Sequence, residues 1–260
     1  MIALRNLDLK GMEGKSVVFF LQSFCSAFGN ISEITFASYL KQPGLNSRLS
    51  SYLEREDTQL LAELNRASST IHLPLWSIFP HLALESRQHV NFFVDSASTH
   101  SHGPKAERYH IAAEDLTTHG INGVTRQLLS DHGLSVCSDV KLKDGTRLQI
   151  PMMDFSIAPS DANQELLLST LRKAGHERGI LVNSGNSYHF YGSALITEAE
   201  FRTFLGHSLL LSPITDARYI AHRLIDGYCN LRILDLEGVI PRISVAFQPG
   251  SSVTPSLRTA

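Results

Sequence analysis

The segment SGNSYH, residues 184–189, combines residue types that can bind phosphate groups. If it forms a strand, Ser187 and His189 are two positions apart and point to the same face. Gly185 in that strand would let the backbone approach a ligand closely. Together with Ser184, these groups offer backbone, hydroxyl and imidazole donors suited to a triphosphate. The spacing is equally compatible with a bulged strand whose histidine forms its hydrogen bonds within the protein.

Asp154 follows the apolar residues 150–153 in the stretch IPMMDFSI, a pattern that is typical of the end of a buried strand. A carboxylate is costly to bury unless it meets a metal ion, a cation or solvent. Asp154 is therefore a candidate metal ligand. The competing interpretation is a strand-end aspartate that caps a turn at Pro159.

Acidic and basic side chains alternate in the segment that begins at Asp216. Arg218 and His222 are four positions apart, so one face of a helix would carry both. Arg232 follows within an apolar strand pattern, where a guanidinium needs an anionic partner. Two interpretations remain open for these cations: they bind phosphate, or they form structural ion pairs with Asp216, Asp226 or Asp235.

Two further motifs are less complete. GMEGKS, residues 11–16, matches half of a phosphate-binding loop, but Leu9 stands where the pattern GxxxxGK[ST] requires a glycine. An ordinary turn is therefore expected there. Asp139 and Lys141, followed by Asp154, distantly resemble the core of a metal-dependent nuclease of the PD-(D/E)xK kind, although the order of the motif differs.

The elements that must position these residues fall on both sides of a polar loop at 98–107, which is the best candidate for a domain boundary. Before this loop the pattern predicts a strand over 2–9, a helix or a buried strand over 16–28, helices over 32–42 and 47–67, and a strand over 89–98.

After the loop, strands and helices alternate. The pattern predicts a helix over 120–133, a hairpin over 135–157 that turns at Asp144-Gly145, a helix over 164–174, a strand over 180–192, a helix capped by Thr197, a helix that ends at Gly227, and a strand over 231–236. The residues after 247 are expected to form a loose tail.

Composition limits the possible functions. Of the 260 residues, 43% are hydrophobic and 18% are charged, which is typical of a globular protein. The formal net charge of −2 gives no overall attraction to phosphate backbones, so any contact with nucleic acid is expected to be local. Cys25, Cys137 and Cys229 suggest neither a disulfide framework nor a metal knuckle. The apolar run at 16–28 is too short to span a bilayer, and a cytoplasmic protein without a membrane segment is expected.

Taken in order, these motifs resemble the catalytic half of the archaeo-eukaryotic primase (primase-polymerase) superfamily over about residues 110–240. PMMDFSI corresponds to its first motif, SGNSYHFYG to its second, and ITD with LRIL to its third motif and the arginine that follows. The resemblance implies an α+β fold with a mixed sheet and flanking helices, preceded by a helix-rich N-terminal region. We accordingly predict an N-terminal region at 1–100 and a primase-like domain at 101–260.

The resemblance also implies roles for individual residues. Asp154 and Asp216 would be catalytic carboxylates that hold Mg²⁺ or Mn²⁺, and the incoming nucleotide triphosphate would be bound by Ser184, Ser187, His189 and Arg232. The sequence departs from the family at Ser156, where the first motif has a second acid. Two-metal transfer uses carboxylates to hold both ions, and Asp216, Asp235 or Glu237 would have to supply what Ser156 lacks.

Three functions follow from these alternatives. The first is a nucleotidyltransferase that acts on nucleic acid with an NTP or dNTP. The second is a catalytically inactive primase-like module that binds a nucleic-acid end, a nucleotide or a protein partner in a multi-subunit system, by analogy one of replication, defence or a mobile element. The third is a nuclease that uses Asp139 and Lys141. A protein partner is expected because the chain is nearly neutral.

Overall fold

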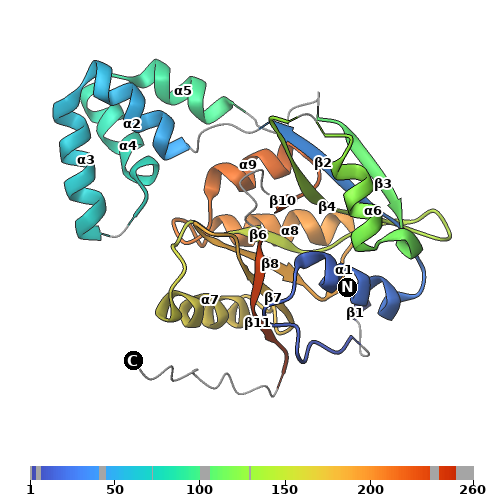
Figure 1. The fold of residues 1–260 in the computed structure, drawn as a ribbon. Coiled ribbons are helices and arrows are strands. Elements are labelled where there is room, and N and C mark those ends of the chain that lie inside the picture. The colour runs from blue at the N-terminus through green and yellow to red at the C-terminus, as the bar shows by residue number, and fades with distance from the viewer. Residues whose placement is uncertain are drawn as a thin grey trace.

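The protein is described by a computed structural model that covers residues 2–3, 7–40, 45–71, 73–99, 106–128, 130–234 and 240–249. Two antiparallel sheets and their helices form the main body, and a group of four helices lies to one side of it (Figure 1). The predicted α+β class is confirmed. Every strand pair among the described residues is antiparallel, whereas a mixed sheet was expected.

The strands form two main sheets. The first has the order β10 (Asn230–Leu234), β4 (His132–Leu142), β2 (Ile31–Leu40) and β3 (Arg108–Ala112), and β5 (Arg147–Gln149) also pairs with β4. The second has the order β11 (Arg242–Phe247), β7 (Gly179–Asn183), β8 (Tyr188–Gly192) and β6 (Met152–Asp154). A short pair joins β1 (Ile2–Ala3) to β9 (Ala194–Leu195).

Helices cover these sheets and share one apolar core with them. They are α1 (Val17–Phe28), the short 3₁₀ helix η1 (Ala113–Asp115), α6 (Thr118–Thr125), α7 (Asp161–Lys173), α8 (Glu198–Leu209) and α9 (Ala217–Asp226). Side chains cap several N-termini, and the predicted cap at Thr197 is confirmed as a capping box with Glu200. Phe20, Phe190 and Tyr191 are fully buried in the core.

The second group of helices, which we call the helical unit, consists of α2 (Leu45–Glu56), α3 (Thr58–Ile71), α4 (Leu75–Ser86) and α5 (Val90–Ser98). It has its own buried cluster of Leu49, Leu53, Leu64, Phe79 and Ala83. Along the chain it lies between β2 and β3, which pair with each other. The division at residues 100 and 101 remains a prediction. In the structure β2 precedes this point and shares its sheet with strands that follow it.

Two predicted elements are wrong, and each has a physical reason. Residues 32–42 were expected to be helical, but 31–40 form β2, a central strand. Since it is buried from Ile34 through Ser38, it lacks the alternation that identifies a half-buried strand. Residues 89–98 were expected to be a strand, but α5 forms there because its Phe92 ring stacks on Tyr52 in α2 at a centroid distance of 3.9 Å.

Other helices and strands are present as predicted but begin or end at different residues. The helix expected over 120–133 ends at Thr125, and β4 begins at His132. The helical region over 47–67 is confirmed but breaks at Asp57, whose carboxylate accepts a hydrogen bond from the Leu60 backbone N–H at 2.9 Å. The strand expected over 180–192 is the hairpin of β7 and β8.

The structure can also be compared with the predicted turns and with the predictions for the two ends of the chain. The turn at Asp144-Gly145 is confirmed between β4 and β5, with Gly145 at φ 87°. GMEGKS forms turns that lead into α1, and Ser16 caps this helix. Of the strand expected over 2–9, residues 2–3 form β1 and residues 7–9 are not in a strand, while 4–6 lie outside the described residues. Residues 235–236 and the part of the predicted tail from 250 onward also lie outside the described residues.

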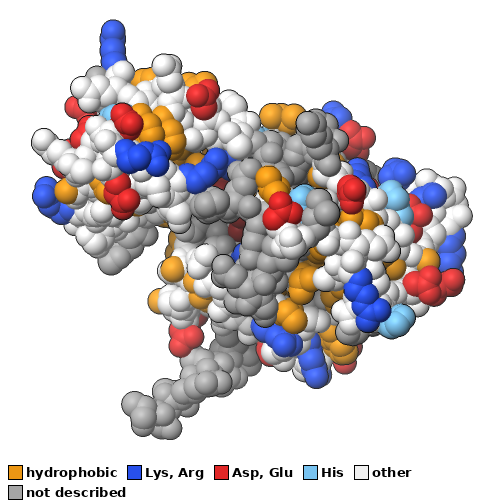
Figure 2. Space-filling view, turned by 45° about the horizontal axis from the view of Figure 1, so that its top comes forward, with side chains coloured by type: hydrophobic (Ala, Val, Ile, Leu, Met, Phe, Trp, Pro, Cys, Tyr) orange, Lys and Arg blue, Asp and Glu red, His pale blue; other side chains and the backbone are white. Residues whose placement is uncertain are grey.

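Within the described residues, no helix combines the length and the apolar character that crossing a bilayer requires. The three cysteines are free and buried. On the face shown in Figure 2, Lys and Arg side chains are interspersed with Asp and Glu side chains over the described surface.

Candidate functional site

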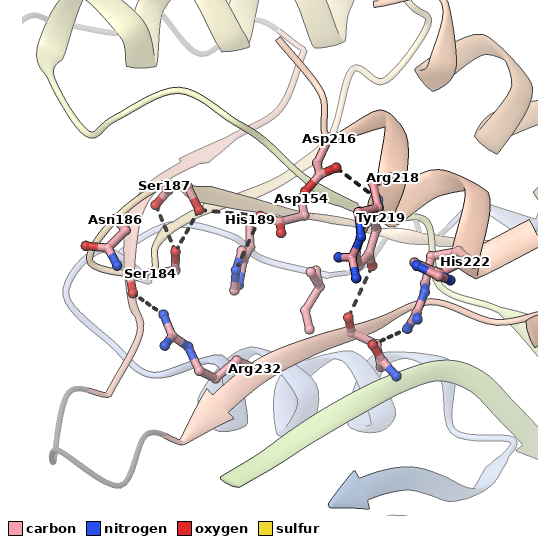
Figure 3. A pocket seen from close by; sticks show the side chains of 13 residues that line it. Asp154, Ser184, Asn186, Ser187, His189, Asp216, Arg218, Tyr219, His222 and Arg232 are labelled. Atoms are coloured by element: carbon pink, nitrogen blue, oxygen red, sulfur yellow. Dashed lines mark hydrogen bonds and ion pairs between the residues drawn. The ribbon is translucent and has the colours of Figure 1, made fainter. Parts of the chain in front are cut away.

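All six predicted site residues line one pocket of about 340 Å³ between the two sheets and α9. Figure 3 shows Asp154 and Asp216 on one side of this pocket, with Ser184, Ser187 and His189 beside them and Arg232 opposite. The side chains that were predicted from distant parts of the sequence therefore lie together. We call this cavity the carboxylate pocket.

Backbone pairing brings the two aspartates together. Residues 154–156, at the end of β6, run alongside residues 214–216: the Ser156 N–H donates to the Ile214 carbonyl at 2.8 Å, and the Asp216 N–H donates to the Asp154 carbonyl at 3.3 Å. Asp216 is also the N-cap of α9, where its Oδ1 accepts from the Tyr219 N–H at 3.0 Å. This cap fixes the carboxylate at the edge of the pocket.

The first four residues of the SGNSYH segment, 184–187, form the turn of the β7–β8 hairpin, and Tyr188 and His189 begin β8. Ser184 and Ser187 close this turn, since the Ser184 N–H and Oγ both donate to the Ser187 carbonyl at 3.0 Å. Gly185 has a φ of 102°, a backbone conformation that favours glycine. The turn thus directs the Ser187 hydroxyl toward Asp154, to which it donates at 3.4 Å.

Arg232 reaches the same turn from the first sheet. Its Nη2 donates to the Ser184 carbonyl at 2.7 Å, so a strand of one sheet is connected to the hairpin of the other. The guanidinium lies opposite the carboxylates in the pocket (Figure 3). From the sequence, Arg232 was expected to need an anionic partner, either a phosphate or a carboxylate of the protein. The hydrogen bond to Ser184 is made to a neutral carbonyl instead.

His189 and Asp154 lie next to each other in the pocket, and the pKa of each is shifted toward its uncharged form. The His189 Nε2 lies 3.6 Å from the Asp154 Oδ1. Burial and the nearby Arg232 lower the pKa of His189 to about 3. Burial, reinforced by the charge of Asp216, raises the pKa of Asp154 to about 7. At neutral pH the imidazole is therefore uncharged, and its Nδ1 is buried without a partner among the described residues.

Three guanidinium groups and two carboxylates line the pocket. Arg218 and Arg223 were not among the six predicted site residues. Arg223 pairs with Asp226 at 3.0 Å, which is one of the structural pairings left open by the sequence. Arg218 donates to the carbonyls of Ala97 and Thr99 at the end of α5, and burial lowers its pKa. Because Asp226 compensates Arg223, the pocket sets the guanidinium groups of Arg218 and Arg232 against two carboxylates.

Tyr219, His222, Asn230 and Asn186 also line the pocket and were not among the predicted site residues. Tyr219 donates its hydroxyl to the Asn230 carbonyl at 3.2 Å, which joins α9 to β10. The spacing of four between Arg218 and His222 is the one sequence signal that bears on this group, and both side chains do contact the Ala97 carbonyl.

The acidic groups of the pocket are two carboxylates, Asp154 and Asp216. The charge of Asp216 contributes to the raised pKa of Asp154, and a divalent cation beside the two groups would favour the charged form of Asp154. Among the described residues no group of three or more His, Cys, Asp or Glu side chains could hold a metal ion. Asp235 and Glu237, the other acids considered from the sequence, lie outside the described residues. The described side chains therefore do not supply a second ion with a carboxylate of its own.

The alternative nuclease residues lie in a separate cluster on β4. Asp139 is buried and accepts two hydrogen bonds from Arg108 Nη2, both at 2.8 Å, and Arg147 lies 3.5 Å away. Lys141 pairs with Glu33 at 3.8 Å. Neither residue lines the carboxylate pocket. The charges of Asp139 are thus compensated by arginines, an arrangement typical of a structural ion pair.

Comparison with protein families identifies this domain. Residues 112–238 match the family described as Archaeo-eukaryotic primase 1D-like, and this segment contains all six predicted site residues. The match over this segment supports membership of the archaeo-eukaryotic primase superfamily. The predicted resemblance over about residues 110–240 is confirmed. Neither the curated proteins nor the solved structures give a significant match.

The acidity of Asp154 predicts a pH-dependent stability. Because its pKa is raised from 3.8 to about 7, the folded state retains a proton that the unfolded state releases between these values. The free energy of unfolding therefore falls as pH rises through this window. Asp154→Asn removes this effect, so in the presence of a chelator the variant should gain about 4 kcal/mol over the wild type between about pH 4 and about pH 8.

Urea unfolding at both pH values measures this difference. Asp161→Asn, on the exposed first turn of α7, is the matched control and should follow the wild type. An equal gain for both variants, or none for Asp154→Asn, would contradict the assignment.

Proposed function

We propose that this protein is a primase-polymerase-like nucleotidyltransferase that adds a nucleotide from an NTP or dNTP to a 3′-hydroxyl. The observation that supports this most is the convergence of Asp154, His189, Asp216 and Arg232 on one pocket inside the segment that matches the primase family. Nucleotide binding, metal binding and catalysis are parts of this proposal.

The triphosphate would lie between the β7–β8 turn and Arg232. Arg232 offers a planar fork of donors that matches phosphate oxygens. Ser184 and Ser187 offer hydroxyls, and His189 offers a neutral ring whose N–H can donate without adding charge. Arg232 would compensate the charge of the phosphates.

Asp154 and Asp216 would hold the divalent cation, Mg²⁺ or Mn²⁺, which when bound neutralises phosphate charge and makes the 3′-hydroxyl more acidic. The oxygen of that hydroxyl attacks the α-phosphorus, and a new P–O bond forms. The bond from the α-phosphorus to the oxygen that bridges to the β-phosphorus breaks, and pyrophosphate leaves with the electron pair. The hydroxyl proton passes to solvent.

An incorporation assay tests the proposal. The protein is incubated with a labelled NTP or dNTP, single-stranded template with or without a primer, and Mg²⁺ or Mn²⁺. Labelled product that requires the metal supports the proposal. Absence of product with every combination of template, nucleotide and metal would refute it, provided the protein is folded by circular dichroism.

Ser156 favours a second candidate function, a primase-like module that binds nucleotide or a nucleic-acid end without catalysis. Ser156 takes the place of the second acid of the first motif, and the described residues offer only two carboxylates in the pocket. This module would bind labelled triphosphate with little dependence on metal and would give no product. A protein partner of either form is proposed from the nearly neutral charge of the chain.

Restoring the missing acid is a direct test of the metal site. Ser156 lies beside Asp154 and Asp216 in the wall of an adjoining cavity, so a carboxylate at this position would face the same ion. Ser156→Asp is expected to tighten Mn²⁺ binding about tenfold, because affinity rises with the number of charged ligands. Electron paramagnetic resonance of free Mn²⁺ measures the affinity.

Ser169→Asp introduces the same charge on the exposed face of α7 and is the control. Equal affinity of the two variants would mean that position 156 is not next to a metal site.

A further inference from the structure

A second cavity, of about 610 Å³, adjoins the carboxylate pocket on the side of the helical unit. The two cavities share the walls formed by Asp154, Asn186, Ser187, Asp216 and Arg218. They therefore meet at the two carboxylates. We call the second one the seam cavity, because its remaining walls come from both the main body and the helical unit.

The helical unit supplies the seam cavity with an aromatic and apolar wall. This wall includes Trp76, Pro74 and Pro80 of α4 and its N-terminus, with His81 at its edge. The Trp76 ring is held by Phe79 and Phe93, each at a centroid distance of 5.7 Å. A ring that is already fixed loses little freedom when a flat ligand packs against it.

Hydrogen bonds hold this wall in place against the carboxylates. Arg218 and His222, both on α9, contact the Ala97 carbonyl at the end of α5 at 3.2 Å. The Asn46 Oδ1 accepts a hydrogen bond from the backbone N–H of Trp76 at 2.9 Å and so connects α2 to α4. The helical unit is thus bonded to the helix that begins at Asp216.

The charge of the seam cavity differs from that of the carboxylate pocket. Among the described residues that line it, Arg218 is the one Lys or Arg, and Asp154 and Asp216 are the carboxylates shared with the carboxylate pocket. The other polar groups are His81, Thr215, serine hydroxyls and the amides of Asn46 and Asn186. Such a wall suits a nucleobase with one phosphate rather than a triphosphate. Its volume falls within the range of about 300–1,000 Å³ that small-molecule sites have.

We propose that the seam cavity binds the acceptor nucleotide, with its base against Trp76 and its phosphate near Arg218. The inference rests on the proposed function, since it places the 3′-hydroxyl beside the carboxylates. The wall residues Asn46, Trp76 and His81 lie outside the segment that matches the primase family, so this part of the site belongs to the helical unit. The acceptor is either the end of a strand or a free nucleotide.

Fluorescence can report this binding directly because Trp76 is the only tryptophan of the chain. The full chain, with chelator present to prevent turnover, is titrated with the hexanucleotide (dA)₆ and, separately, with dAMP. Saturable quenching is expected. Quenching by (dA)₆ alone assigns the site to a strand end, and quenching by dAMP with similar affinity assigns it to a free initiating nucleotide.

Two variants test the position of the ligand by anisotropy of labelled (dA)₆ or a labelled mononucleotide. Trp76→Ala should weaken binding about tenfold, which corresponds to the stacking of one base. Because Trp76 also packs within the helical unit, His81→Glu provides a second test: it adds a negative charge at the exposed edge of the cavity and should weaken binding several-fold. Leu84→Glu adds the same charge to an exposed position of α4 and should bind like the wild type.

Binding of a labelled, non-hydrolysable triphosphate is measured in parallel samples of the same proteins, with Mg²⁺ in place of the chelator. If the triphosphate binds but neither probe quenches Trp76, or if His81→Glu and Leu84→Glu behave alike, the seam cavity is not the acceptor site and the proposed function stands. Failure of the triphosphate arm itself would refute the proposed function instead.

Discussion

Asp154→Asn is expected to lower the rate of nucleotide incorporation by about 1,000-fold, because it removes one of two carboxylates that could hold the cation. Such a loss corresponds to about 4 kcal/mol of transition-state stabilisation. The amide has the same shape as the carboxyl group, so the Ser187 hydroxyl retains an acceptor. Rates of primer extension under single-turnover conditions measure the effect.

Asp161→Asn again serves as the control, since Asp161 is exposed at the start of α7 and outside the pocket. Thermal unfolding shows whether both variants keep the fold. An Asp154→Asn variant with at least a tenth of the wild-type rate would exclude a role of Asp154 in catalysis, while the same residual rate in both variants would point to a contaminating polymerase.

Arg232→Ala is expected to weaken binding of a non-hydrolysable triphosphate about 30-fold, or about 2 kcal/mol. The arginine lies opposite the carboxylates, and it is the guanidinium that approaches the β7–β8 turn. The loss of this cation also removes a positive charge from a pocket that contains two acidic side chains, Asp154 and Asp216. Binding is followed by isothermal titration calorimetry.

Arg232→Lys keeps the charge and loses the planar fork, so it should recover only part of the affinity. Arg172→Ala, on the exposed face of α7, should bind like the wild type. Unchanged affinity in Arg232→Ala would place the triphosphate elsewhere. Because Arg232 also bonds to the Ser184 carbonyl, the circular dichroism of the variant is compared with that of Arg232→Lys.

Much of the carboxylate pocket could be predicted because local sequence determines its parts. Asp154 ends an apolar strand, Gly185 permits the turn that presents Ser187, and Asp216 is a helix cap. These signals depend on neighbours a few positions away. Their order along the chain, not their distance in space, suggested the family.

The seam cavity could not be predicted in this way. Arg218 bonds to carbonyls at residues 97 and 99, which are 121 and 119 positions away in the chain. No local periodicity encodes such a contact. Likewise β2 was expected to be a helix, because a central strand buried on both faces loses the alternation on which strand prediction depends.

The pairing of β2 with β3 has a consequence for how this protein can diversify. The Ser38 N–H donates to the Glu107 carbonyl at 2.9 Å, so the chain leaves the sheet and returns to it at neighbouring points. In topological terms the helical unit is the loop of a β-hairpin, and the cost of closing a loop grows only slowly with its length. An exchange of this loop would alter the wall that Trp76 provides while the strands that carry Asp154 and Arg232 keep their register, so the proposed acceptor site and the proposed triphosphate site could change independently.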